Sequence, residues 1–233
     1  MRIQILFNRV CCFAVLIMAF AAVSSCKKST STATTSVQAI NASPDAGTVN
    51  LFLSGNLKTT APVAYGNSSG YFSTIAGNQT GEVKAAASGT TLATFPVSLG
   101  ANAYYSVFVT GQTSTNNVTA FYAQDKLDVP SPGKAKIRFV HAVADVPSVD
   151  LMLNTNTVFS ALAYTVVSDY VEVAAGTYSI RATFKVPGGT GIGVTTAFNQ
   201  TFNNAKIYTV VFKGAKGATS DALKLGLGVM LNN

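Results

Sequence analysis

The chain of 233 residues contains the same sequence pattern twice, with the two copies offset by one hundred residues. Residues 37–53 align without a gap with residues 137–153. The identical pairs are Ala42 and Ala142, Asp45 and Asp145, Val49 and Val149, Leu51 and Leu151, and Leu53 and Leu153. Such a duplication predicts two tandem copies of one structural unit, which we place at residues 37–130 and 134–233. The segment between them is rich in Pro and Gly, as expected of a linker between two units.

Within each copy, apolar and polar residues alternate over short runs that end at Gly, Asn, Pro or Ser, which is typical of β-strands. In residues 179–184 the apolar side chains fall on one face and the polar ones on the other, and residues 49–53 and 208–212 read similarly. The one weak helical pattern after the N-terminal segment, at 220–225, is too short for a helix. We therefore predict an all-β fold with two tandem Ig-like, Greek-key β-sandwich domains of about seven strands each.

The first 25 residues have the pattern of a cleaved signal peptide. Arg2 and Arg9 supply the basic start, and an unbroken apolar run of 14 residues follows at 10–23. As a helix this run would span roughly 21 Å, which is short of the roughly 30 Å hydrocarbon core of a bilayer. Export followed by cleavage is therefore favoured over a permanent membrane-spanning helix.

Residues 23–26, Val-Ser-Ser-Cys, follow the apolar run directly and resemble the lipobox of bacterial lipoproteins, with Val in place of the commoner Leu. The resemblance implies that Cys26 becomes the first mature residue and carries covalent lipid. More than one acyl chain would anchor the protein, because each buried methylene contributes roughly 0.8 kcal/mol. The alternative is an ordinary signal peptide cut elsewhere, which would leave Cys26 as a free thiol. Residues 26–36 are rich in Ser and Thr, which predicts a flexible tether.

Composition excludes several other classes of protein. With 11% charged and 48% hydrophobic residues, the chain is not disordered. Its 3 Cys and 1 His are too few for a zinc finger, a disulfide scaffold or a multi-histidine metal enzyme. Because Cys11 and Cys12 leave with the signal peptide, we expect no disulfide. We also expect no metal and no cofactor besides the lipid on Cys26.

The second copy opens with Arg-Phe-Val-His-Ala-Val-Ala-Asp-Val-Pro-Ser-Val-Asp-Leu at 138–151. This stretch resembles the start of the bacterial extracytoplasmic family catalogued as domain of unknown function 4397, and residues 174–181 and 208–211 resemble later parts of it. The first copy is similar but fainter, with Asn41 and Asn50 in place of His141 and Asp150. The resemblance covers nearly all of residues 37–214. It implies an exported β-sandwich module and assigns no catalytic residue.

Two patterns could be taken for catalytic or cofactor-binding motifs. Residues 66–70, Gly-Asn-Ser-Ser-Gly, match the Gly-x-Ser-x-Gly motif of serine hydrolases literally. That motif needs a strand-to-helix turn and a His base, but no helical pattern follows, and His141 lies in the other copy. The Gly-rich run at 188–193 lacks the spacing of a dinucleotide loop, and we interpret it as a hairpin turn.

The polar residues around the start of each copy have a structural interpretation as well. We predict that His141 ends a strand and forms hydrogen bonds to the adjacent turn, a role that Asn41 fills in the first copy. Asp45 and Asp145 are predicted to close local Asx turns. A metal or acid/base role for His141 with Asp145 and Asp150 is the alternative, but the spacing offers too few ligands for calcium.

Charge is uneven between the copies, with a net of −1 over 37–130 and +4 over 134–233. Lys206, Lys213, Lys216 and Lys224 could form a basic surface near the C-terminus. Such a surface would attract lipid headgroups, lipopolysaccharide phosphates or acidic polysaccharide, whereas nucleic acid is not expected outside the cytoplasm. The alternative is a solvated surface that serves solubility.

Together these patterns predict a lipid-anchored lipoprotein of the bacterial cell envelope, at the outer membrane and either periplasmic or surface-exposed. We expect a non-catalytic module with a structural, adhesive or ligand-presenting role. The closest alternative is a glycan- or nutrient-binding accessory of an outer-membrane uptake system. A small serine hydrolase is the third alternative.

Overall fold

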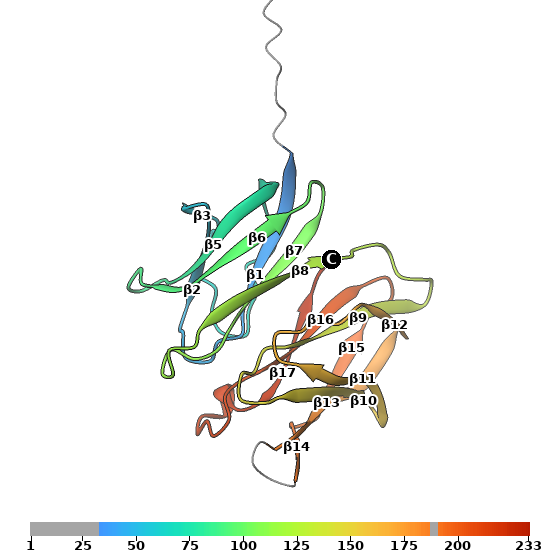
Figure 1. The fold of residues 1–233 in the computed structure, drawn as a ribbon. Coiled ribbons are helices and arrows are strands. Elements are labelled where there is room, and N and C mark those ends of the chain that lie inside the picture. Colours follow the sequence, from blue (N-terminus) through green and yellow to red (C-terminus); the bar gives the residue numbers. More distant parts are fainter. Residues whose placement is uncertain (1–32, 187–190) are drawn as a thin grey trace, which may run out of the picture. The chain divides into compact units, whose positions relative to one another are not determined.

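Each copy of the repeated sequence folds into two β-sheets that enclose a core of its own (Figure 1). The computed structural model describes residues 33–186 and 191–233. The strands of the first copy are β1 (Thr34–Asn41), β2 (Val49–Leu53), β3 (Asn56–Leu57), β4 (Phe72–Ile75), β5 (Gly77–Ala85), β6 (Thr91–Leu99), β7 (Tyr104–Thr110) and β8 (Thr119–Asp125). Those of the second copy are β9 (Lys134–His141), β10 (Ser148–Leu153), β11 (Asn156–Ala163), β12 (Val171–Ala174), β13 (Gly176–Lys185), β14 (Ile192–Val194), β15 (Phe198–Phe202), β16 (Ile207–Lys213) and β17 (Gly226–Leu231). A single turn of 3-10 helix lies at Asp221–Leu223.

The two copies share one topology. In the first copy the sheets have the strand orders β4-β1-β7-β8 and β3-β2-β5-β6. In the second copy they have the orders β12-β9-β16-β17 and β11-β10-β13-β14, with β15 also paired to β13. In each copy the first strand runs parallel to a late one, β1 with β7 and β9 with β16, so these two sheets are mixed. The predicted all-β sandwich fold is confirmed.

Two details differ from the prediction. Eight strands are described in the first copy and nine in the second, against about seven expected in each. The second copy has one more than the first because β14 and β15 pair with opposite ends of β13, whereas β6 alone pairs with β5. The tether predicted for 26–36 also ends earlier. Residues 34–36 already pair with β4, and the hydroxyl of Thr35 donates to the carbonyl of Ala103 at 2.8 Å. Thr has a high strand propensity, so the Thr-rich end of this segment can pair as a strand.

Alternation along the strands builds the core of each sandwich. Ile180 and Ala182 are fully buried and Phe184 packs beside them, as the pattern at 179–184 predicts. The first-copy core includes Val37, Val49, Leu51, Leu53, Val83, Phe95, Val97, Tyr105 and Val107. One glycine in each copy allows an aromatic ring to cover the neighbouring strand. A Cβ on Gly81 would lie 2.4 Å from the Phe95 ring, and one on Gly193 would lie 2.4 Å from the Phe184 ring.

The central strands of the mixed sheets, β1, β7, β9 and β16, are largely buried on both faces, because each of these sheets also contacts the other copy. A third apolar cluster draws its residues from both copies: Ile40, Ala42 and Phe108 from the first, and Val140, Ala142, Val211 and Met230 from the second. Residues 208–212, for which the alternation indicated one polar face, are buried throughout. Strands of this kind are apolar on both faces, as in the centre of a covered sheet. Residues 33–233 thus form one compact unit.

Candidate functional site

A buried ion pair lies where the two copies meet. Arg138 in β9 and Asp125 at the end of β8 are 1% and 3% exposed, and a guanidinium nitrogen lies 2.5 Å from a carboxylate oxygen. The guanidinium also donates to the hydroxyl of Ser106 at 3.0 Å and to that of Thr209 at 2.9 Å. Its charged carbon lies 5.0 Å from the centre of the Tyr170 ring. Every one of these contacts stabilises a charge that burial would otherwise disfavour.

Asp125 receives further hydrogen bonds from the first copy. Ser106 donates to its second carboxylate oxygen at 2.7 Å, and the hydroxyl of Tyr71 donates to the same oxygen. Asn232 from the second copy in turn donates to the Tyr71 hydroxyl at 3.2 Å. Burial and the adjacent Asp125 charge raise the pKa of Tyr71 well above its usual value. Tyr71 therefore remains a neutral donor to the carboxylate.

The network repeats across the two copies with different residues. Gln38 in β1 occupies the position of Arg138 in β9, and each donates to a hydroxyl on the neighbouring parallel strand, at Ser106 and Thr209 respectively. That hydroxyl then donates to Asp125 in the first copy and to Asn232 in the second, at 2.7 and 2.8 Å. The uncharged Gln38 thus stands at the position equivalent to Arg138, and the uncharged Asn232 stands at the position equivalent to Asp125. Within this network, the two charged side chains are Arg138 and Asp125, and they contact each other.

His141 has the structural role predicted for it. Its Nδ1 accepts a hydrogen bond from the backbone N–H of Val143 at 3.2 Å, and its Nε2 lies 2.7 Å from the carbonyl of Val146. This pattern assigns the proton to Nε2. Asn41 makes the equivalent bonds in the first copy, accepting from the N–H of Ser43 and donating to the carbonyl of Gly47. Both side chains hold the loop after the first strand.

Burial of His141 predicts a pH-dependent stability. Burial lowers the pKa of His141 to about 4, so the unfolded chain binds a proton between about pH 6.5 and 4 that the folded chain does not. The free energy of unfolding should therefore decrease by up to about 3 kcal/mol as the pH falls from 6.5 to 4. Urea unfolding at several pH values should show this loss in the wild type, and His141→Asn, which copies Asn41, should reduce it. An unchanged pH dependence in the variant would contradict this assignment.

The prediction of a local Asx turn at Asp45 is wrong. Its carboxylate accepts the backbone N–H groups of Thr113 and Ser114, at 2.7 and 2.9 Å, from the loop between β7 and β8. These bonds lower the pKa of Asp45 below its usual value, although burial acts in the opposite direction. The partners are 68 and 69 residues away, so a local sequence pattern could not reveal them. Asp145 lies in the corresponding loop of the second copy.

The Gly-x-Ser-x-Gly segment lies at the joint, meaning the interface between the two copies, and is followed by strand β4 and not by a helix. Ser68 donates to the side-chain oxygen of Gln38 at 2.6 Å and accepts the N–H of Gly70 at 3.1 Å. Gly66, with φ of +78°, leaves space for the Lys213 side chain. The two ring nitrogens of His141 are bonded to their own loop, so the structure does not pair this histidine with Ser68. Of the Gly-rich run, residues 188–190 lie outside the described part of the chain.

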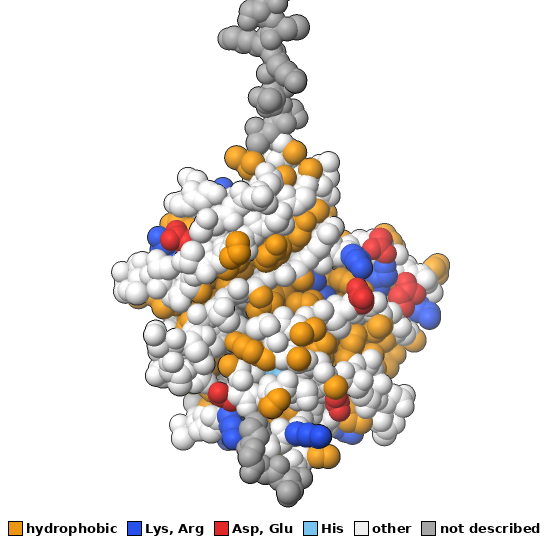
Figure 2. Space-filling view, viewed as in Figure 1, with side chains coloured by type: hydrophobic (Ala, Val, Ile, Leu, Met, Phe, Trp, Pro, Cys, Tyr) orange, Lys and Arg blue, Asp and Glu red, His pale blue; other side chains and the backbone are white. Residues whose placement is uncertain are grey.

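Lys206 lies at one end of β16, whereas Lys213, Lys216 and Lys224 lie near its other end, so the four predicted lysines do not all gather in one place. Lys206 precedes β16 and Lys213 ends it, which separates them by roughly 23 Å at the usual rise per residue. Lys213 is half-buried with its ammonium 4.3 Å from the centre of the Tyr65 ring, and burial lowers its pKa. Lys224 pairs with Asp221 at 2.7 Å, and Lys216 is exposed. On the face in Figure 2, basic side chains lie among acidic ones in small separate groups.

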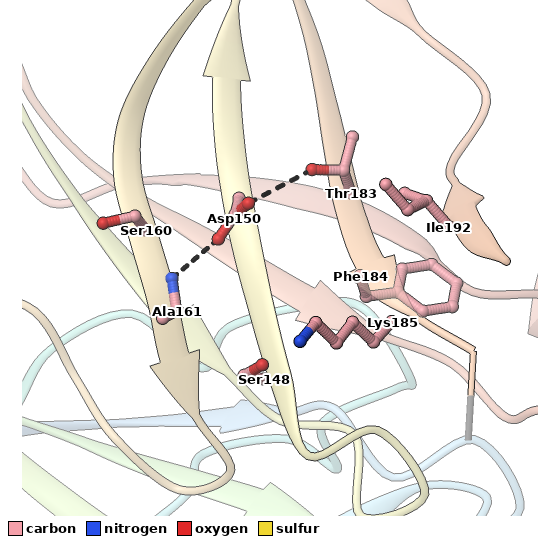
Figure 3. A pocket seen from close by; sticks show the side chains of 8 residues that line it. All are labelled: Ser148, Asp150, Ser160, Ala161, Thr183, Phe184, Lys185 and Ile192. Carbon is pink, nitrogen blue, oxygen red and sulfur yellow. Dashed lines mark hydrogen bonds between the residues drawn. The ribbon is translucent and has the colours of Figure 1, made fainter. Parts of the chain in front are cut away.

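A groove lies on the outer face of the second copy (Figure 3). Its volume is about 410 Å³, within the usual range for small-ligand sites. It crosses the sheet β11-β10-β13-β14 and is lined by Ser148, Asp150, Ser160, Ala161, Thr183, Phe184, Lys185 and Ile192. Of these residues, only Asp150 was a candidate functional residue from the sequence. The others come from four strands, and only the strand pairing shows that they adjoin.

In 33–186 and 191–233, no helix is long and apolar enough to cross a membrane. No group of three or more His, Cys, Asp or Glu side chains in these ranges is placed to hold a metal ion. Cys26, the predicted signal peptide and most of the predicted tether lie outside the described residues.

The fold and the joint define a class of protein in which two β-sandwiches of one topology are repeated in tandem and packed together. The chain belongs to the family described as Domain of unknown function (DUF4397), which matches residues 35–151 and 135–226. The matches confirm the resemblance inferred from 138–151, and their positions are consistent with two tandem copies.

No curated protein matches the chain by sequence. Among solved structures, a carbohydrate-binding module of family CBM26 from Eubacterium rectale Amy13K, in complex with maltoheptaose, is 9% identical with a TM-score of 0.24. The match covers 82% of this chain and 100% of that one. A candidate cell adhesion protein from Bacteroides eggerthii is 11% identical with a TM-score of 0.24, over 86% of this chain and 96% of that one. Likenesses at this level say nothing about the function of this chain.

Proposed function

We propose that the chain is a lipid-anchored lipoprotein of the bacterial envelope whose paired sandwiches act as a non-catalytic structural, adhesive or ligand-presenting module. The observation that carries the proposal is the joint around Arg138 and Asp125. A buried ion pair with hydrogen bonds from both copies suits a body that must keep one arrangement of its two sandwiches. Such a body on a lipid-anchored tether would present its outer surfaces at a fixed spacing.

The residues that resemble catalytic groups also fit this proposal. His141 uses both ring nitrogens to hold its own loop, and Ser68 is hydrogen-bonded to Gln38. A nucleophile needs a base within hydrogen-bond reach, and these two side chains have other partners. We therefore place both residues in the framework of the module.

A second candidate function is that of a glycan- or nutrient-binding accessory of outer-membrane uptake. The groove on the outer face of the second copy favours it, since polar groups of several strands converge there.

The anchor is tested by metabolic labelling with an alkyne fatty acid in a bacterial host. The wild-type chain should be labelled and should sediment with membranes, whereas Cys26→Ala should lose the label entirely. Cys12→Ala is the matched control, because this cysteine lies in the part that is expected to be cleaved. Equal labelling of the wild type and Cys26→Ala would overturn the anchor.

A further inference from the structure

A β-bulge shapes the groove on the outer face of the second copy. Pairing between β10 and β11 shifts register around Leu151, and the side chain of Asp150 accepts the backbone N–H of Ala161 at 2.6 Å. Ala161 has a φ of +51°, which is uncommon for a residue other than Gly. The carboxylate therefore substitutes for a ladder bond and holds the bulge open. Bulges and strained backbone of this kind are enriched at binding sites.

Beside the bulge, polar groups of two strands share the outer face. Asp150 lies opposite Thr183 in the register of β10 and β13. The second carboxylate oxygen of Asp150 is 3.5 Å from the Thr183 hydroxyl, so it can still accept a stronger bond. Ser148 and Lys185 lie next along the same strands, and Figure 3 shows the Lys185 side chain extending across the groove toward Ser148.

One edge of the groove is apolar. Ile192 pairs with Lys185 in the register of β13 and β14, and 72% of its surface is exposed. Val194 follows on the same face and is 57% exposed. The groove thus combines hydroxyls, one carboxylate and one ammonium with an aliphatic border. The two charges cancel, which disfavours strongly anionic and strongly cationic ligands alike.

We propose that this groove binds a neutral, polyhydroxylated ligand, namely a saccharide chain, with Asp150, Thr183 and Lys185 bonding its hydroxyls and Ile192 packing against its apolar ring face. Hydroxyl groups both donate and accept, which matches a site that offers a carboxylate acceptor and an ammonium donor side by side. The groove is lined by four neighbouring strands, so a saccharide chain can lie across them. The inference deepens the second candidate function and rests on it.

The equivalent face of the first copy is closed by its own side chains. Asn50 replaces Asp150 and accepts a hydrogen bond from the buried Thr59 at 3.2 Å. Lys84, at the position of Thr183, pairs with Glu82 at 3.5 Å and lies over the Phe52 ring. Because these groups already satisfy one another, the first copy supplies a control surface within the same chain.

The test is isothermal titration of the purified full chain with cellohexaose, maltohexaose, laminarihexaose and xylohexaose, and with an oligogalacturonate as the anionic comparison. At least one neutral probe should bind saturably with a Kd below about 1 mM. Lys185→Ala and Thr183→Val should each weaken that binding about tenfold. Both side chains lie on the outer face, and unfolding curves would verify that each variant stays folded. Lys84→Ala, the matched control, should leave the affinity unchanged.

Three outcomes would overturn the proposal: no saturable binding to any neutral probe, binding to the oligogalacturonate alone, or binding that Lys84→Ala weakens as much as Lys185→Ala does. The titration uses purified protein, so its result does not depend on the lipid at Cys26. Failure of the groove and failure of the anchor are therefore separate results.

Discussion

Arg138→Ala is expected to destabilise the body by about 3–5 kcal/mol, because it leaves the Asp125 carboxylate buried without its counter-charge. The guanidinium also bonds Ser106 and Thr209, so its loss removes contacts with both copies. Urea unfolding at pH 7, followed by far-UV circular dichroism, measures the change. A loss below about 1 kcal/mol would mean that the pair is solvated in solution and does not hold the joint.

The duplication itself provides the control for this experiment. Arg138→Gln gives the second copy the residue that the first carries at Gln38, and Asp125→Asn gives the first copy the residue that the second carries at Asn232. Each single variant should be destabilised, since it leaves one buried charge without its partner. The double variant should lose less than the two single losses added together, by about 1–3 kcal/mol, because no unpaired charge remains. Additive losses would show that the two side chains are not coupled.

Phe108→Ala, a variant at the same joint, is expected to lower the free energy of unfolding by about 3–5 kcal/mol. The Phe108 ring is fully buried, stacks on Phe121 at 5.2 Å between centroids, and lies beneath the Arg138 guanidinium. Its removal leaves a cavity between sheets that cannot collapse easily, since both are fixed by their own sandwiches. The same urea unfolding experiment measures this loss.

Phe52→Ala is the matched control for the aromatic truncation. Phe52 is half-buried on the outer face of the first copy, where Lys84 covers it. Phe52→Ala should lower the free energy of unfolding far less than Phe108→Ala, because water can fill the space that the Phe52 ring leaves. Equal losses in the two variants would contradict the assignment of Phe108 to a shared core.

Local patterns predicted much of the fold. The alternation at 179–184 assigned the correct face to Ile180, Ala182 and Phe184, since each strand has one face toward its own core. Comparison of Asn41 with His141 predicted their shared role, because each bonds atoms of the loop within six residues of it, although Asn41 also donates to the more distant carbonyl of Val63. A local sequence pattern can predict interactions of this short range, because both partners lie within it.

The joint and the groove could not be predicted in the same way. Gln38 and Arg138 occupy positions that look like ordinary outward-facing polar residues in a strand, and only the packing of a second sheet buries them. The apolar run from Val107 to Val109 was the available signal, because it leaves neither face of the strand polar. The groove depends on a bulge held by Asp150, and a register shift has no local sequence pattern that identifies it.

The placement of one charge in each copy also determines which sandwich can associate with which. Two first copies brought together through the same faces would enclose Asp125 opposite Gln38, and two second copies would enclose Arg138 opposite Asn232. Either arrangement traps an ion without its counter-ion, so only the pairing of unlike copies is favoured. Neighbouring molecules of this protein would therefore be discouraged from associating through two first copies or two second copies.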